Sequence, residues 1–295
     1  MEFKLLFSVS NYSFLQVDES EKTLLEDHFS ESRPAQIYFI LAKNRVKINN
    51  KYVSFDEKQI ELEFKIQEKD DYFSEKIQWN HPYKDLKKLE VISDYPYCDF
   101  KVVDEEGSPL IIGKSAYFLE QFHEQVNQKE FLDYEVLYIG QSVSVKDVVP
   151  VADRTNPHST LKNILAQYGR LHPDKEIFLL FAAIKQDAAL YIPQNRKLSD
   201  AKKFAKGLVD FYGTKSQPNI KQQITLCEAS LINYFKPHFN DKFKDHPPSK
   251  KHSSFRDLHK LNLGKVQVTV DLNFAPRLFS TSAERLSKHY FEYDL

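Results

Sequence analysis

The chain has 295 residues, a formal net charge of -1 at pH 7 and a hydrophobic fraction of 41%, which is enough for a sizeable core. Its longest unbroken apolar run covers only residues 177–184, far short of the ~20 residues that cross a bilayer. The first residues lack the basic cluster and apolar core of a secretory signal, and two cysteines cannot form a disulfide framework. We therefore expect a cytoplasmic protein without a membrane partner.

In chain order, the first predicted elements are strands. Residues 36–41 form a compact apolar and aromatic run, and residues 60–66 alternate strictly between apolar and polar side chains. Residues 99–103 and 110–112 flank a polar segment with Gly and Pro, which predicts a hairpin. A short helix is expected over residues 117–126.

The later elements mix strands and helices. A predicted strand at 134–140 is followed by a helix at 157–168, whose apolar residues recur at helical spacing behind Asn156 as candidate N-cap. The other predicted elements are strands at 176–184, 188–192 and 266–273, and helices at 199–211, about 223–235 and 282–290.

These elements predict an α+β protein with several parts. Residues 1–115 are expected to form a β-rich accessory domain, and residues 116–130 a connecting helix. Residues 131–245 are expected to form the second domain, with an insertion at 185–223, and residues 246–295 a basic extension. Residues 1–130 carry 17 Lys and Arg against 25 Asp and Glu, whereas the remainder carries 24 against 17. A polyanion would therefore bind the second part, although ordinary surface variation accounts equally well for the asymmetry.

One acidic side chain occupies an unusual position. Glu228 lies within an apolar helical stripe, which is formed by Ile224, Leu231, Ile232 and Phe235. Burying a carboxylate costs several kcal/mol unless a cation or hydrogen bonds compensate for it. A metal ion is one such cation, and a buried Arg or Lys is the structural alternative.

The order of several other residues carries a family resemblance. Tyr138-Ile139-Gly140 ends a strand, Arg154 and His158 stand four apart near the next helix, and Asn240 follows Glu228 by twelve positions. In this order, residues 131–243 resemble the GIY-YIG nuclease superfamily. The resemblance implies a GIY-YIG-like α/β core with a small mixed sheet and flanking helices.

The resemblance also implies roles in phosphodiester hydrolysis, a reaction that needs a base, positive charge near phosphorus and a neutralised leaving oxygen. Tyr138 would help to activate the attacking water, Arg154 would stabilise charge at phosphorus, and His158 would position or share the proton. Glu228 would hold Mg²⁺ or Mn²⁺, ions that prefer oxygen ligands. Asn240 would orient the site by hydrogen bonding.

The sequence departs from the family pattern in two ways. No Gly-Ile-Tyr triplet stands upstream of Tyr138, and the nearest candidate for the first tyrosine is Tyr134, for which plain packing is the favoured interpretation. Pro157 lies between Arg154 and His158, so the two side chains need not share one helical face.

A basic segment follows the Glu228 helix. Its Lys and Arg residues could follow a phosphate backbone, and a solvated basic loop is the alternative interpretation. The candidate nucleic-acid contacts are Lys236, Lys242, Lys244, Lys250, Lys251 and Arg256.

The sequence therefore favours a divalent-metal-dependent endonuclease that cuts DNA rather than RNA, with a role in restriction or phage defence by analogy with the family. The alternative is a catalytically inactive module that binds nucleic acid or protein. A protein partner is expected through the amino-terminal part, and a homo-oligomer is left open.

Overall fold

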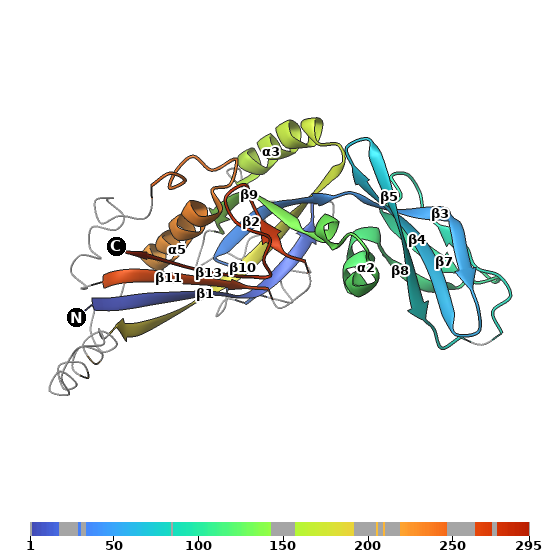
Figure 1. The fold of residues 1–295 in the computed structure, drawn as a ribbon, viewed down its shortest axis with the longest axis horizontal. Coiled ribbons are helices and arrows are strands. Elements are labelled where there is room, and N and C mark those ends of the chain that lie inside the picture. The colour runs from blue at the N-terminus through green and yellow to red at the C-terminus, as the bar shows by residue number, and fades with distance from the viewer. Residues whose placement is uncertain are drawn as a thin grey trace.

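The computed structural model describes residues 2–17, 29–30, 34–83, 85–142, 157–191, 205, 209, 219–246, 263–272 and 276–294. Its main feature is a curled seven-stranded mixed sheet (Figure 1). The strand order is β12-β9-β2-β10-β1-β11-β13. The bounds are β1 Glu2–Gln16, β2 Ile37–Asn44, β9 Tyr134–Gln141, β10 Lys175–Tyr191, β11 Leu263–Asp271, β12 Leu278–Phe279 and β13 Lys288–Asp294.

Most neighbouring strands of this sheet are antiparallel, whereas β1 with β11 and β12 with β9 run parallel. β1 is therefore held between strands from the middle and the end of the chain. Figure 1 accordingly shows both termini at the same side of the sheet.

Two helices cover opposite faces of the sheet. α3 (Pro157–Leu171) buries Leu161 and Ile164 in a cluster with Ile40 and Leu137. α5 (Ile220–Phe235) packs against the other face, where Phe235 meets Phe39 edge to face. Phe39 and Ile40 are consecutive strand residues, so their side chains point to opposite faces of the sheet. Because each face is covered by a helix, β2 is apolar along nearly its whole length.

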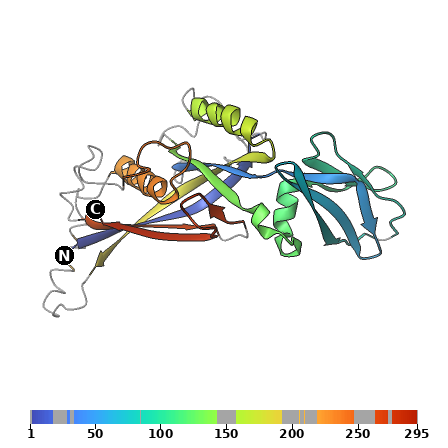
Figure 2. The same ribbon diagram turned by 45° about the horizontal axis from the view of Figure 1, so that its top comes forward.

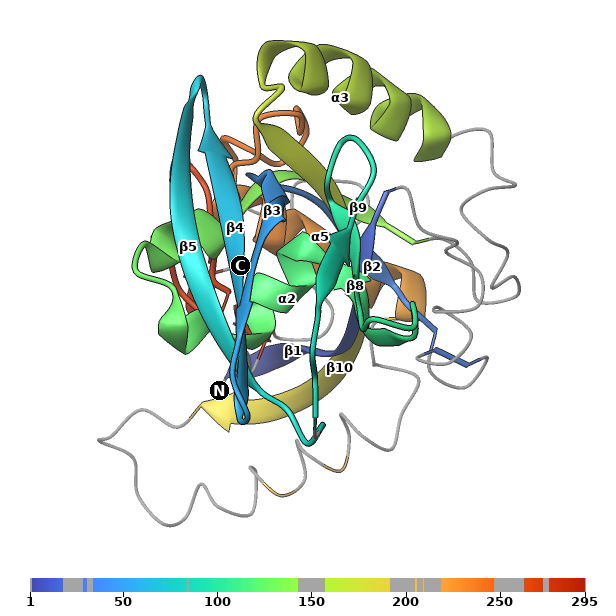
Figure 3. The ribbon, with the colours of Figure 1, turned by 90° about the vertical axis from the view of Figure 1, so that its right-hand side faces the viewer.

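A second β-structure is inserted between β2 and β9, and we call residues 46–133 the inserted domain. It contains two antiparallel three-stranded sheets, β3-β4-β5 and β6-β7-β8 (Figures 1 and 3). The bounds are β3 Val46–Phe55, β4 Gln59–Glu68, β5 Asp71–Asn80, β6 Glu90–Ile92, β7 Asp99–Val103 and β8 Pro109–Lys114. The helix α2 (Ser115–Gln121) and the 3₁₀ turns His123–Gln125 and Lys129–Leu132 lead back to the main sheet (Figure 2).

Hydrogen bonds fix the inserted domain to the loop between α3 and β10. The Asp174 carbonyl accepts from the Arg45 backbone N–H at 2.7 Å, and its carboxylate accepts from the Lys69 backbone N–H at 2.9 Å. Nearby, the buried Lys43 ammonium pairs with Glu120 of α2, to which the Tyr134 hydroxyl also donates. The β4–β5 turn and α2 are thus both attached to the main sheet.

The expected α+β class is confirmed, and the strand and helix predictions on which it depends are largely correct. The strand with Val266, Val268 and Val270 is formed, and all three side chains are buried as the alternation requires. The helix expected at 199–211 lies outside the described residues apart from positions 205 and 209, and Asn156 also lies outside them. No helix within the described part of the chain is long and apolar enough to cross a membrane.

The structure corrects the expected division of the chain. β1 and β2 belong to the same sheet as β9 and β10, so residues 1–115 do not form a separate unit. The carboxy-terminal extension likewise supplies β11, β12 and β13 to that sheet, and β10 continues to Tyr191, into the expected insertion at 185–223. Backbone pairing between distant segments, which local patterns do not record, decides these groupings.

The helix expected at 282–290 is also wrong. Residues 288–294 form β13, in which His289 and Phe291 are buried and Lys288, Tyr290 and Glu292 are exposed or partly exposed. This period of two is the pattern of a strand with one face buried, and pairing with β11 satisfies its backbone.

Candidate active site

The pairing of β2 with β9 brings two tyrosines together. In this antiparallel register Tyr38 lies opposite Gly140, and Tyr138 stands two residues before Gly140 on the same strand. Alternation places all three residues on one face of the sheet. The two aromatic rings lie 5.9 Å apart between centroids.

Gly140 provides the room for this pair. A Cβ atom at position 140 would lie 2.8 Å from ring carbons of both Tyr38 and Tyr138, well inside van der Waals contact. Any larger residue would therefore push the two rings away from the strand end. The glycine of the Tyr-Ile-Gly triplet has a steric role here.

The two phenols influence each other's ionisation. Burial raises the pKa of both, and the neighbouring Tyr138 hydroxyl raises that of Tyr38 further. For Tyr138, the polar contributions of Tyr38 and of Thr160 on α3 oppose burial and the Glu228 charge, although its pKa stays above the ordinary value. Tyr138 is therefore the more readily ionised phenol of the pair.

Glu228 faces the same site from α5. The helix begins with a capping box in which Asn219 and Gln222 exchange hydrogen bonds, and it ends at Lys236 in the left-handed conformation. As the stripe predicted, Leu231, Ile232 and Phe235 are buried, whereas Glu228 reaches the wall of a cavity.

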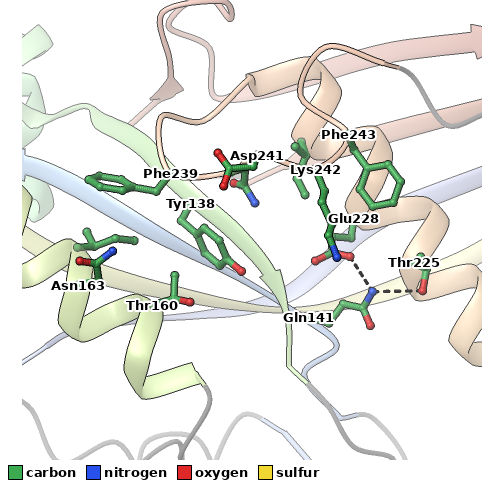
Figure 4. Close-up of a pocket in the computed structure, with 13 residues that line it drawn as sticks. Tyr138, Gln141, Thr160, Asn163, Thr225, Glu228, Phe239, Asp241, Lys242 and Phe243 are labelled. Carbon is green, nitrogen blue, oxygen red and sulfur yellow. Dashed lines mark hydrogen bonds between the residues drawn. The ribbon is translucent and has the colours of Figure 1, made fainter.

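The carboxylate of Glu228 is held by a neutral partner. Gln141 Nε2 donates to Glu228 Oε2 at 2.6 Å and to Thr225 Oγ1 at 3.2 Å (Figure 4). Burial raises the pKa of Glu228, while the Gln141 amide and the Lys242 charge lower it. Among the described residues no cation lies within 4.0 Å of this carboxylate, so the buried Arg or Lys alternative finds no support there.

Asn240 fixes the edge of β9. Its side-chain oxygen accepts from the Ile139 backbone N–H and its amide donates to the Ile139 carbonyl, both at 2.9 Å. The Phe239 backbone N–H donates to the Leu137 carbonyl beside it. The segment after α5 thus pairs with the strand that carries Tyr138, and Asn240 is a positioning residue.

These elements enclose an open cavity of about 920 Å³. Tyr138 lies between α3 and the segment after α5, with Glu228 and Lys242 across the opening from it (Figure 4). The lining residues are Tyr138, Gln141, Thr160, Asn163, Ile164, Thr225, Glu228, Ile232, Phe239, Asn240, Asp241, Lys242 and Phe243. We call this cavity the Tyr138 pocket.

Three of the predicted site residues, Tyr138, Glu228 and Asn240, therefore meet at one pocket. Arg154 lies outside the described residues, and His158 belongs to the first turn of α3, where only the backbone is described. Of the basic candidates, Lys242 lines the pocket, whereas Lys236 caps α5 and Lys244 Nζ lies 3.5 Å from the His238 carbonyl. Lys250, Lys251 and Arg256 are outside the described residues.

The sequence did not identify the residue that takes the place of the first tyrosine in the family pattern. Tyr134 is fully buried, and its hydroxyl donates to Glu120, which fits the packing interpretation. Tyr38 stands beside Tyr138 instead, although 100 positions separate them. The available signal was the Gln36-Ile37-Tyr38 triplet at the start of an apolar strand, whose partner strand follows only after the inserted domain.

The donor atoms at the pocket fit a hard divalent cation. Within the described ranges, no group of three or more His, Cys, Asp or Glu residues gathers that could hold a metal by itself. Mg²⁺, however, is commonly bound by one or two carboxylates together with waters and substrate phosphates. Glu228, with hydroxyl and amide oxygens around an open cavity, supplies such a set.

Comparisons of the chain with models of protein families, with curated proteins and with solved structures found no match.

Proposed function

We propose that the chain is a divalent-metal-dependent endonuclease whose site is related to the GIY-YIG type, with DNA as the favoured substrate. The observation that carries this proposal is the convergence of three groups on one open pocket. The rings of Tyr38 and Tyr138 stand over the sterically required Gly140, and the Glu228 carboxylate, which has no cation within 4.0 Å among the described residues, lines the same pocket. In this proposal Gln36-Ile37-Tyr38 takes the place of the missing Gly-Ile-Tyr half.

The chain's own groups can perform the proton transfer of hydrolysis. Tyr38 and Thr160 favour the ionised form of Tyr138, whereas burial and the Glu228 charge raise its pKa above the ordinary value. In the ionised form, its oxygen would take a proton from an attacking water, directly or through a second water. Tyr38 orients Tyr138 and supports its charge, and its own strongly raised pKa keeps it protonated.

A divalent cation bound at Glu228 would act as a Lewis acid and stabilise the leaving 3′ oxygen. The role of Glu228 is to present an ionised carboxylate at the cavity wall, and Gln141 fixes the direction of that carboxylate. Lys242 adds positive charge at the opening, where a phosphate would enter. Arg154 and His158 remain proposed as the charge-stabilising and proton-sharing residues.

The decisive experiment is cleavage of a plasmid with Mg²⁺ or Mn²⁺ by the intact chain and by single variants. Glu228→Ala, Tyr138→Phe and Tyr38→Phe should each lower the rate, with Glu228→Ala and Tyr138→Phe below about 1% of the intact protein. Tyr134→Phe removes a hydroxyl from the same strand outside the pocket and should keep most of the activity. Cutting that survives Glu228→Ala would overturn the metal role.

The same assay separates the alternative function. The absence of a group of three or more metal-binding side chains among the described residues also suits a module that binds nucleic acid without cutting it. In that case the chain would retain DNA in a salt-sensitive manner and show no metal-dependent cleavage. An RNA substrate of equal sequence tests the preference for DNA.

A further inference from the structure

The Tyr138 pocket has two chemically different ends (Figure 4). Glu228 and Lys242 lie at one end, where the proposed function places the cation and the phosphate. Phe239 and Asn163 lie at the other end, beyond Tyr138. A cavity of about 920 Å³ is in the size range of sites that hold whole small molecules, so it has room for a further group beside the cation and the phosphate.

Phe239 is held in position at its end of the pocket. Its backbone N–H donates to the Leu137 carbonyl at 3.0 Å, which ties the residue to β9. Its ring meets those of Tyr168 and His238 edge to face, with centroids 6.4 Å and 4.8 Å apart. These contacts leave the side chain half-buried, and it lines the pocket. A fixed aromatic ring of this kind is a surface on which nucleobases stack.

Asn163 adds a hydrogen-bond donor at the same end. It follows Thr160 by three residues on α3, so both side chains lie on the helix face that lines the pocket. Its Oδ1 accepts from Gln167 Nε2 at 2.7 Å, which orients the amide. The amide nitrogen lies on the side toward Tyr138 (Figure 4). Such an amide N–H donates to the oxygen and nitrogen acceptors on the edge of a base.

We propose that Phe239 and Asn163 form a subsite for one unpaired nucleobase, next to the phosphate that is cut. The base stacks on Phe239 and accepts a hydrogen bond from Asn163. In a paired duplex both faces of a base are covered by its stacked neighbours, so only a base that has left the stack can enter. The substrate class is therefore single-stranded or locally opened DNA. This inference rests on the proposed function, from which it takes the position of the phosphate.

A binding experiment in EDTA tests the subsite without cleavage. The intact chain is titrated with a fluorescein-labelled thymidine oligonucleotide and with a labelled abasic strand of equal length, while fluorescence anisotropy is followed. The two ligands carry the same phosphates and differ only in their bases. We expect the thymidine strand to bind about 10-fold more tightly, because only its bases can stack. Equal affinity for the two strands would overturn the subsite.

Matched variants assign the preference for bases to Phe239 and Asn163. Phe239→Leu removes the flat ring and should weaken binding of the thymidine strand about 10-fold without changing that of the abasic strand, whereas Phe239→Tyr should bind like the intact chain. Phe55→Leu alters a half-buried phenylalanine of the inserted domain and should change neither affinity. Equal affinity of Phe239→Leu and Phe239→Tyr for the thymidine strand would overturn the role of the ring.

Asn163→Ala should weaken binding of the thymidine strand about 3-fold, because it removes one hydrogen-bond donor. Asn80→Ala removes an exposed amide of the inserted domain and is the control. Equal affinity of these two variants would overturn the role of Asn163. If melting curves show that Phe239→Leu is unfolded, the comparison of the two strands by the intact chain still decides the proposal.

Cleavage rates separate this inference from the nuclease proposal. With Mg²⁺, a single strand should be cut about 10-fold faster than the same sequence in a full duplex. A supercoiled plasmid should be cut faster than its relaxed form, because negative supercoiling favours local opening of the strands. Equal rates on single strand and duplex would overturn the subsite and leave the nuclease proposal standing. Absence of cleavage on every substrate would overturn the nuclease proposal, whereas the titrations in EDTA would still decide whether a base binds.

Discussion

At the scale of single residues, the Tyr138 pocket depends on the absence of a side chain at Gly140. Because Gly140 has no side chain, the rings of Tyr38 and Tyr138 can lie 5.9 Å apart between centroids. The Glu228 carboxylate on a neighbouring helix completes the arrangement, held by the Gln141 amide and with no cation within 4.0 Å among the described residues. Two predictions follow from this geometry.

Gly140→Ala should displace the tyrosine pair. The new Cβ would lie 2.8 Å from both rings, and such overpacking costs about 1–3 kcal/mol. We expect a lower melting temperature and loss of cleavage. Gly113→Ala is the matched control, because its nearest contact would be an ordinary 3.9 Å. A Gly140→Ala protein that is as stable and active as the intact chain would contradict the steric role.

Glu228 should make stability depend on pH and on metal. Burial raises its pKa, so the folded state favours the protonated carboxyl; this contribution is present at low pH and is lost as pH rises through the raised value. Without metal, Glu228→Gln should therefore melt higher than the intact chain at neutral pH. Cleavage by the intact chain should rise with pH over the same window, because cation binding needs the ionised form.

Mg²⁺ provides the second readout for Glu228. At about 100 times its dissociation constant, Mg²⁺ should stabilise the intact chain by about 2.7 kcal/mol. The Glu228→Gln protein should gain nothing from the ion. Thermal melts with and without Mg²⁺ measure both effects, and equal stabilisation of the two proteins would exclude Glu228 as the ligand.

At the scale of elements, the exposed edge of β9 is closed by the segment after α5 rather than by a full strand. β12 pairs with β9 only at Tyr134 and Glu135, and no other described strand pairs with the Tyr138 end of β9 on that side. Asn240 supplies the missing backbone partners with its amide, at Ile139. The helix that carries Glu228 and the strand that carries Tyr138 are thereby held in register.

Asn240→Ala should therefore lower both stability and activity. It leaves the N–H and carbonyl of Ile139 without partners in a buried place, which costs about 1–3 kcal/mol. Asn219→Ala, which removes the cap of α5 away from the pocket, should cost about 1 kcal/mol but keep cleavage at a temperature where both variants are folded. Denaturant melts and plasmid cleavage measure the two effects. Equal activity of the two variants would argue against a positioning role for Asn240.

At the scale of the whole molecule, charge is divided between the inserted domain and the main sheet. The inserted domain holds 12 basic and 19 acidic residues, and the rest of the chain holds 29 and 23. A polyanion would thus be attracted more strongly to the part with the Tyr138 pocket than to the inserted domain. The two parts are nevertheless joined, since β2 is followed by β3 after Arg45 alone.

Asp174 should stabilise the connection between the inserted domain and the main sheet. Its carboxylate accepts from the Lys69 backbone at the β4–β5 turn, and hydrogen bonds to charged groups contribute about 1.5–3 kcal/mol. Asp174→Ala should lower the free energy of unfolding by this amount or less and speed amide exchange at residues 67–71. The exposed Asp70→Ala is the control and should do neither. Unchanged exchange in Asp174→Ala would show that other contacts hold the turn.

Elements whose signals are local could be predicted from the amino-acid sequence alone. The stripe around Glu228 predicted α5 and its unusual acid, and alternation predicted the strand at 60–66 and the buried valines of β11. These patterns succeed because helix and strand periodicities appear within a few turns or residues of the chain. The twelve-residue interval to Asn240 likewise pointed to a residue that lies at the pocket.

The identity of neighbouring strands, in contrast, could not be predicted before the chain was seen folded. Tyr38 meets Tyr138 because β2 and β9 pair across an insertion of about 90 residues, and no local pattern records a contact between such distant segments. The same cause explains the displaced domain boundary at 115, since β1 gains its partners from β10 and β11. β13 was mistaken for a helix because its buried face exists only once β11 lies beside it.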